Sequence, residues 1–182
     1  MTAAHNRRRI VRAVAQFLGI ILLMALTARS ESVPEFAAKD LSGQEQSLSA
    51  HRGKIMVVNF WATWCGPCRE ELPMLNQLAG QYSAGDVFFV AISLDDDSTR
   101  AKIPNFLDKK KITLPVWIGA DTDTLKQLDL GKFVPDTMIL DRDGAVVTRI
   151  MGEAQRKDIT TRLDWLLGGR TGEAPAALVK HL

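Results

Sequence analysis

A strand that leads directly into a closely spaced cysteine pair constrains this chain more than any other feature of its sequence. Residues 55–61 (IMVVNFW) form a continuous apolar and β-branched run, which is typical of a central strand covered on both faces. Apolar residues at helical spacing follow Pro67, a residue type favoured in the first turn of a helix. Cys65 and Cys68 therefore lie where a buried strand ends and a helix begins.

This position favours a reactive thiolate at Cys65. Unpaired backbone N–H groups and the positive end of the helix dipole stabilise negative charge, so we expect the pKa of Cys65 to lie below the free-thiol value of about 8.5. Cys68 lies on the same helical turn, where its thiol can attack a mixed disulfide formed by Cys65. Gly66 lets a partner chain approach, and Pro67 limits the geometry of the loop. The pattern predicts dithiol–disulfide exchange, which needs no cofactor.

Two other uses of the cysteine pair are weaker. A structural bridge that closes so short a loop would remove little entropy from the unfolded chain. A zinc site would need two further ligands, and the three histidines, His5, His51 and His181, lie far apart in the sequence. We therefore expect a redox-active pair and no metal site.

Residues 1–30 have the composition of an export signal. Five of the 23 Lys and Arg residues and no acidic residue precede Glu31, and residues 13–28 carry no charge. A basic segment followed by an apolar one fits both a cleaved signal peptide and an uncleaved signal anchor. Positive charge is retained on the cytoplasmic side, which predicts a periplasmic or external location for the remainder. A core helix and a twin-arginine signal are the less favoured interpretations.

The remainder of the chain is typical of one globular domain over residues 31–168, followed by a loose tail over residues 169–182. With 18 basic and 21 acidic residues after position 30, it lacks the clustered basic face of a nucleic-acid-binding protein.

The pattern of apolar residues and turn residues predicts the remaining elements. We expect short strands within 30–54, strands at 87–94 and 114–118, helices at 98–110, 123–128 and 155–167, and an antiparallel hairpin of 137–140 with 145–151.

Two segments of the chain resemble the thioredoxin superfamily, and specifically its membrane-facing TlpA/ResA-like branch, over about residues 35–167. They are residues 48–73 (LSAHRGKIMVVNFWATWCGPCREELP) and 134–137 (VPDT). The resemblance implies an α/β thioredoxin fold, with a central mixed β-sheet flanked by helices and an N-terminal β extension.

The resemblance also implies how the site contacts its substrate. Pro135 would be cis and lie against the cysteine pair, where Val134 and Pro135 present backbone to a substrate strand. Trp64, which adjoins Cys65, is expected to contact partners. Considered without the family, Pro135 also fits an ordinary turn proline.

The resemblance raises the question of which group accepts the proton of Cys68. The buried acid that precedes the motif in cytosolic thioredoxin is replaced here by Asn59. In ResA-like proteins a buried acid after the next strand has been assigned this role, and Asp96 is the nearest match. Burial would raise the pKa of Asp96 and allow it to take the thiol proton. The alternative is a solvated acidic loop made by Asp95, Asp96 and Asp97.

The residues and the resemblance together predict an extracytoplasmic thiol–disulfide oxidoreductase. It would reduce disulfides in exported proteins, of the kind handled in cytochrome c maturation or copper-site assembly, and a membrane electron donor would restore its dithiol. The alternatives are a disulfide-forming oxidase on the same fold and a redox-inert module that binds a partner. An uncleaved N-terminal segment would keep the protein at the membrane.

Overall fold

The structure is a computed structural model that describes residues 34–181. The expected export signal, and with it the domain boundary at residue 30, lies outside the described residues. None of the helices within residues 34–181 is long and apolar enough to cross a bilayer.

One mixed sheet organises the described residues. Its strands are β1 (Ala38–Asp40), β2 (Glu45–Gln46), β3 (Ile55–Trp61), β4 (Val87–Ser93), β5 (Val116–Ile118), β6 (Asp136–Leu140), β7 (Val146–Met151) and β8 (Leu178–Lys180). They lie in the order β2-β1-β5-β4-β3-β6-β7-β8. β3 pairs in parallel with β4 and antiparallel with β6, and β6 and β7 form the expected antiparallel hairpin.

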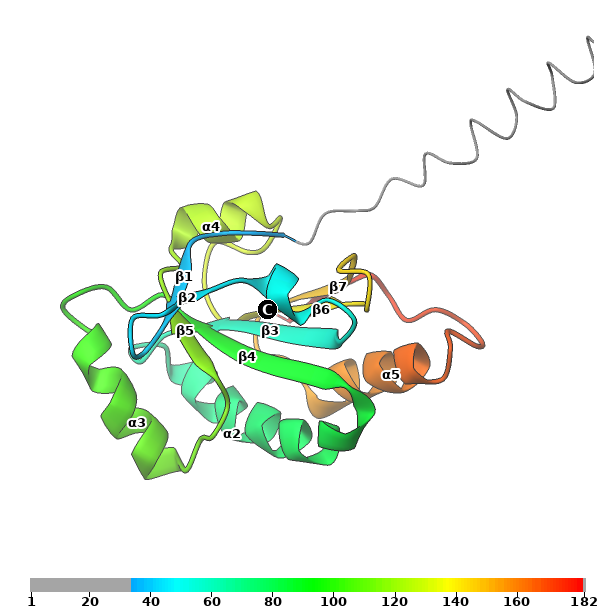
Figure 1. Cartoon of the computed structure of the whole chain (residues 1–182), viewed down its shortest axis with the longest axis horizontal. Coiled ribbons are helices and arrows are strands. Elements are labelled where there is room, and N and C mark those ends of the chain that lie inside the picture. The colour runs from blue at the N-terminus through cyan, green and yellow to red at the C-terminus, as the bar shows by residue number, and fades with distance from the viewer. Residues whose placement is uncertain (1–33, 182) are drawn as a thin grey trace, which may run out of the picture. The chain divides into compact units, whose positions relative to one another are not determined.

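Helices cover both faces of this sheet. They are α2 (Gly66–Gln81), α3 (Ile103–Lys110), α4 (Thr122–Gln127) and α5 (Arg156–Leu167), with short 3-10 turns η1 (Leu48–His51), η2 (Ser83–Gly85) and η3 (Arg100–Lys102). Figure 1 shows α2, α3 and α5 on one side of the sheet and α4 on the other. The expected α/β thioredoxin fold, with an N-terminal β extension formed by β1 and β2, is confirmed.

Strand β3 connects two hydrophobic cores because side chains alternate between the faces of a strand. Ile55 and Val57 pack in the cluster that includes residues of α2, α3 and α5, whereas Met56 and Val58 pack in the cluster that includes residues of α4 and η1. All seven residues of β3 are buried, which confirms the central strand expected from the sequence. Burial of each large apolar side chain stabilises the fold by about 1.5–3 kcal/mol.

Two expectations about the elements are wrong. The helix predicted from residue 98 begins only at Ile103, because Pro104 occupies its first turn, where a missing backbone N–H costs nothing, and η3 precedes it. The C-terminal residues are not a loose tail throughout, since β8 pairs in parallel with β7. A three-residue strand is too short to show a periodic pattern in the sequence.

Candidate active site

The cysteine pair begins α2. Cys65 is the N-cap residue, and its Sγ accepts a hydrogen bond of 3.2 Å from the backbone N–H of Cys68. The two side chains form a disulfide. Cys65 is 6% exposed and Cys68 is fully buried, so Cys65 is the sulfur nearer to solvent. After reduction, a Cys65 thiolate in this place is stabilised by the same N–H donor and by the helix N-terminus.

The loop that connects β3 to α2 is held by Asp95. Its buried carboxylate accepts hydrogen bonds from the backbone N–H of Thr63 (2.8 Å), from Thr63 Oγ1 (2.5 Å) and from Ser93 Oγ (2.8 Å). Because Thr63 lies two residues before Cys65, these bonds position the start of α2.

The proline loop lies against the disulfide. The Val134–Pro135 peptide bond is cis, as the family resemblance implied, and Val134 O lies 3.4 Å from Cys65 Sγ. Two aromatic side chains beside these residues face solvent: Trp64 is 59% exposed and Phe133 is 82% exposed. Trp64 was expected from its place beside Cys65, whereas Phe133 carried no signal in the sequence. Large exposed aromatic rings beside a reactive sulfur are suited to contact a polypeptide.

Asp136, which directly follows Pro135, fixes the proline loop in place. Its fully buried carboxylate accepts hydrogen bonds from the backbone N–H groups of Gly131 (2.8 Å) and Gly152 (3.3 Å). Burial raises the pKa of Asp136 to about 6, although these two hydrogen bonds act in the opposite direction. Sequence reasoning did not identify this residue as part of the site.

Asp96 does not have the environment that the sequence analysis expected. Its carboxylate accepts hydrogen bonds from Ser98 Oγ (2.6 Å) and from the backbone N–H groups of Ser98 (2.9 Å) and Thr99 (3.2 Å). These bonds, led by that of the Ser98 hydroxyl, lower the pKa of Asp96. The expectation of a buried Asp96 with a raised pKa is wrong, because the loop turns this side chain toward solvent.

The buried carboxyl group on the cysteine helix is instead Glu71. It is 2% exposed and lies three residues after Cys68 on α2, a spacing that places both side chains on one helix face. Its Oε1 accepts a hydrogen bond from the backbone N–H of Ala154 (3.2 Å), and Oε2 accepts one from Asn59 Nδ2 (3.4 Å). Burial raises the pKa of Glu71 from its ordinary value of 4.5 to about 8.

Asn59 connects this carboxyl group to the sheet. Asn59 Nδ2 also donates to Thr137 Oγ1 (3.0 Å) on the neighbouring strand β6, which pairs with β3 at these two residues. Glu71 thus contacts the very residue that replaces the buried acid of cytosolic thioredoxin. The helical spacing from Cys68 was a pattern in the sequence from which Glu71 could have been found.

A groove of about 810 Å³ lies beside the disulfide. It is lined by Pro67, Pro135, residues 152–155, Lys180 and His181. Pro67 lies between the two cysteines and Pro135 follows Val134, so the groove borders the redox site, although neither cysteine lines it. Within residues 34–181, no three His, Cys, Asp or Glu side chains gather as candidate metal ligands.

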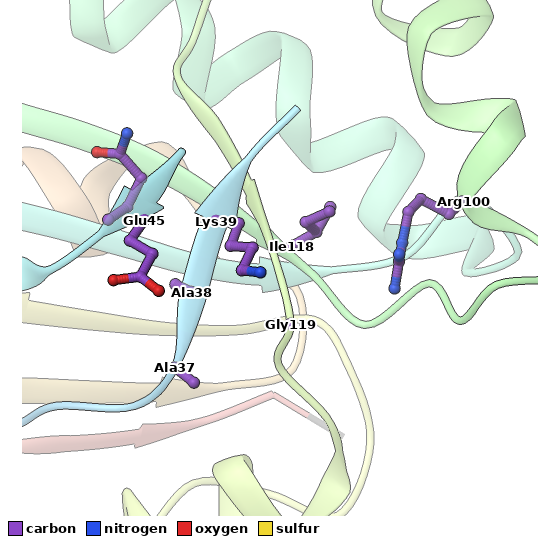
Figure 2. A pocket seen from close by; sticks show the side chains of 8 residues that line it. Ala37, Ala38, Lys39, Glu45, Arg100, Ile118 and Gly119 are labelled. Atoms are coloured by element: carbon purple, nitrogen blue, oxygen red, sulfur yellow. The ribbon is translucent and has the colours of Figure 1, made fainter. Parts of the chain in front are cut away.

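A second hollow, of about 490 Å³, lies at the opposite edge of the sheet. Figure 2 shows Lys39 of β1, Ile118 of β5 and Arg100 of η3 around it. Arg100 pairs with Asp97 at 3.1 Å. None of its lining residues belongs to α2 or to the proline loop, and β1 lies five strands from β7 in the sheet order, so we do not assign it to the redox site.

The β-strand, Cys-x-x-Cys and helix unit, together with a cis-proline loop that faces the cysteines, defines the class of thiol–disulfide oxidoreductases with a thioredoxin fold. The Redoxin family model matches residues 28–163. The chain belongs to the Redoxin family, and it is a thiol–disulfide oxidoreductase.

Known relatives agree with this assignment. The thiol-disulfide oxidoreductase ResA of Bacillus cereus is 33% identical over 129 residues, which cover 71% of this chain and 73% of the relative. ResA of Geobacillus kaustophilus is 31% identical over 137 residues, which cover 75% of this chain and 77% of the relative. A crystal structure described as thiol:disulfide interchange protein DsbE, from Chlorobium tepidum, superposes with a TM-score of 0.67 at 27% identity and covers 75% of this chain and 95% of that chain.

Proposed function

We propose that this protein is a reductase of disulfides in exported polypeptides. The observation that carries the exchange chemistry is the arrangement at the start of α2: Cys65 at the N-cap, the more exposed of the two, with Cys68 fully buried one turn along. Because Cys65 is the more exposed of the two residues, we assign to it the attack on the substrate, and to Cys68 the resolution of the mixed disulfide. The Gly-Pro dipeptide between the cysteines resembles that of the reducing members of the superfamily.

The exchange proceeds in two steps. The Cys65 thiolate attacks one sulfur of the substrate disulfide, which forms a mixed disulfide and releases the other substrate sulfur as a thiolate that takes a proton from water. Cys68 then loses its proton and attacks Cys65 Sγ, which forms the Cys65–Cys68 disulfide and releases the second substrate thiolate. Two electrons pass to the substrate, and an external dithiol donor returns them.

Glu71 is the proton acceptor that we assign to Cys68. Burial raises the pKa of Glu71 to about 8, so at pH 7 about a tenth of the folded protein carries the ionised carboxylate that can take the thiol proton, and this fraction rises with pH. Asp96, which the sequence favoured, faces solvent and has a lowered pKa. Glu71 therefore replaces Asp96 in the proposed mechanism.

The cellular setting is also part of the proposal. The basic and apolar composition of residues 1–30 supports export to the periplasm or the external face of the cytoplasmic membrane. There the protein would receive electrons from a membrane donor and act on substrates of the cytochrome c maturation or copper-site assembly type, as the resemblance to the TlpA/ResA-like branch implies. Fractionation of cells that express the full chain tests the location.

Trapping the substrate tests the exchange itself. In a Cys68→Ala variant the first step is intact and the second is blocked, so mixed disulfides with cellular proteins should accumulate through Cys65 and disappear on treatment with dithiothreitol. The matched control is Cys65→Ala, which removes the accessible sulfur and should trap little. If neither variant accumulates adducts, the protein is not an exchange enzyme and the redox-inert module is favoured.

The reduction potential of the Cys65–Cys68 pair decides the direction. A reductase should have a potential near the −270 mV of thioredoxin, whereas a value near the −120 mV of a strong oxidase would favour the oxidase alternative. Equilibration of the full chain with glutathione or dithiothreitol buffers measures this value.

A further inference from the structure

The C-terminal segment, residues 177–181, is an integral part of the domain although it lies beyond the residues matched by the Redoxin family model. β8 pairs with β7 in the register Arg149↔Leu178 to Met151↔Lys180 and forms the outer edge of the sheet. Val179 packs against the core that contains the cysteines. The segment therefore has a defined position relative to the redox site.

Polar contacts hold both ends of this segment. Before its start, the buried Arg162 donates from Nη2 to Ala176 O (2.8 Å). At its end, the backbone N–H of His181 donates to Met151 O (2.8 Å), and His181 Nε2 lies 2.7 Å from Asp158 Oδ2. Hydrogen bonds to charged groups, such as that of the Arg162 guanidinium, contribute more than neutral ones, so these contacts together place the segment.

The anchored end reaches the active-site groove. Gly152 has a φ of +89°, and a Cβ atom there would overlap His181 O, so only glycine allows this close approach. The backbone N–H of Gly152 donates to Pro135 O (2.9 Å), which joins the turn to the proline loop. Lys180 and His181 consequently line the same groove as Pro135.

The segment changes the charge of the groove. Without it, Glu153 would be the only charged side chain among the lining residues. Lys180 adds a positive charge, and among residues 34–181 neither Lys180 nor Glu153 forms an ion pair. Glu153 alone would repel an acidic side chain of a substrate. Beside Lys180, such a side chain can be accepted.

We propose that residues 177–181 form one wall of the substrate groove and that Lys180 binds an acidic side chain close to the reactive cysteine of the substrate polypeptide. This inference rests on the proposed exchange function, because it concerns the polypeptide that Cys65 attacks. Pro67 and Pro135, which adjoin the cysteine pair and Val134, line the groove together with Lys180, so a polypeptide that extends from Cys65 into this groove would meet the wall.

Two synthetic peptides test the proposal. Each carries an internal disulfide, and they differ only in having Glu or Gln next to one cysteine. The full chain is reduced, freed of reductant and mixed with each peptide at low ionic strength, and the second-order rate constant of peptide reduction is measured by acid quenching. Wild-type protein should favour the Glu peptide, and Lys180→Glu should lower the Glu-to-Gln rate ratio about two- to fivefold, the range expected for one exposed ion pair.

Three controls isolate the groove wall. Lys39→Glu makes the same charge change on β1, at the opposite edge of the sheet from β8, and should leave the ratio unchanged. Bis(2-hydroxyethyl) disulfide, which is small and neutral, should be reduced at the wild-type rate by Lys180→Glu. A chain ending at Ala176 should lose the preference for the Glu peptide, and the point variant serves if this truncated chain does not fold.

The two ideas fail in different ways. If wild-type protein reduces both peptides but Lys180→Glu and Lys39→Glu have the same rate ratio, the wall proposal is overturned and the exchange function stands. If wild-type protein reduces neither the peptides nor bis(2-hydroxyethyl) disulfide, the exchange function itself fails.

Discussion

Replacing Glu71 by Gln should make the protein more stable, and the gain should grow with pH. Burial holds the pKa of Glu71 at about 8 in the folded protein, against an ordinary value of 4.5. Between these two values the unfolded chain loses the proton while the folded protein keeps it, so folding stability falls as the pH rises and levels off above about 8. Gln has nearly the same shape and no charge, and it removes this cost.

The magnitude follows from the two pKa values. Each pH unit between them is worth about 1.4 kcal/mol, so the ionisation of Glu71 costs the wild-type protein less than about 1 kcal/mol at pH 5, about 3 kcal/mol at pH 7 and about 4–5 kcal/mol at pH 8.5. The variant is expected to exceed wild type in free energy of unfolding by increments of this order. The measured difference should be somewhat smaller than these values, because an NH2 group of Gln in place of Glu71 Oε2 cannot accept the hydrogen bond that Asn59 Nδ2 now donates.

Urea unfolding of both proteins with the disulfide intact, at pH 5, 7 and 8.5, measures this difference. Glu70→Gln is the matched control, because Glu70 is the exposed neighbour on the same helix and should change stability by less than about 0.5 kcal/mol at every pH. A Glu71→Gln difference that stays constant across this pH range would refute the claim that a buried, protonated carboxyl group lies beneath the cysteine pair.

Three further outcomes follow from the structure. Asp95→Asn should destabilise the protein by about 1–3 kcal/mol in urea unfolding because a buried acceptor of three hydrogen bonds is altered, whereas Asp97→Asn, at an exposed side chain, should have almost no effect. Gly152→Ala should increase proteolysis of the C-terminal segment, while Gly43→Ala, at an equally positive φ in open space, should not. Phe133→Ser should leave the unfolding midpoint unchanged and slow reduction of a protein disulfide severalfold; an unchanged rate would remove Phe133 from the contact surface.

Local patterns in the sequence were sufficient for the centre of the fold. The apolar run that became β3, and the cysteine pair followed by a helix, depend on neighbouring residues only, and the hairpin of β6 and β7 follows from a turn between two apolar runs. Alternation and helical spacing report which side of an element is buried. The family resemblance added the cis-Pro135 and its place against the cysteines, which no local pattern could supply.

Which carboxylate is buried depended on the tertiary structure. Asp95 and Asp96 are adjacent in the chain, yet the loop after β4 turns Asp95 inward to Thr63 and Asp96 outward to Ser98. Glu71 is buried because α2 packs its face against the sheet at Asn59, a contact between residues twelve positions apart. Desolvation depends on everything that surrounds a group, so it cannot be assigned from neighbours in the sequence.

The position of the reactive cysteine pair is thus determined by neighbouring residues, since the strand, the two cysteines and the start of the helix are contiguous in the chain. The surroundings that tune it and guide its substrate come from distant segments: Glu71 beneath, Val134 and Pro135 opposite, and the C-terminal strand that brings Lys180 to the groove. The pairing of β7 with β8 depends on which strand edge the rest of the sheet leaves unpaired, and the residues of β8 alone do not specify that edge.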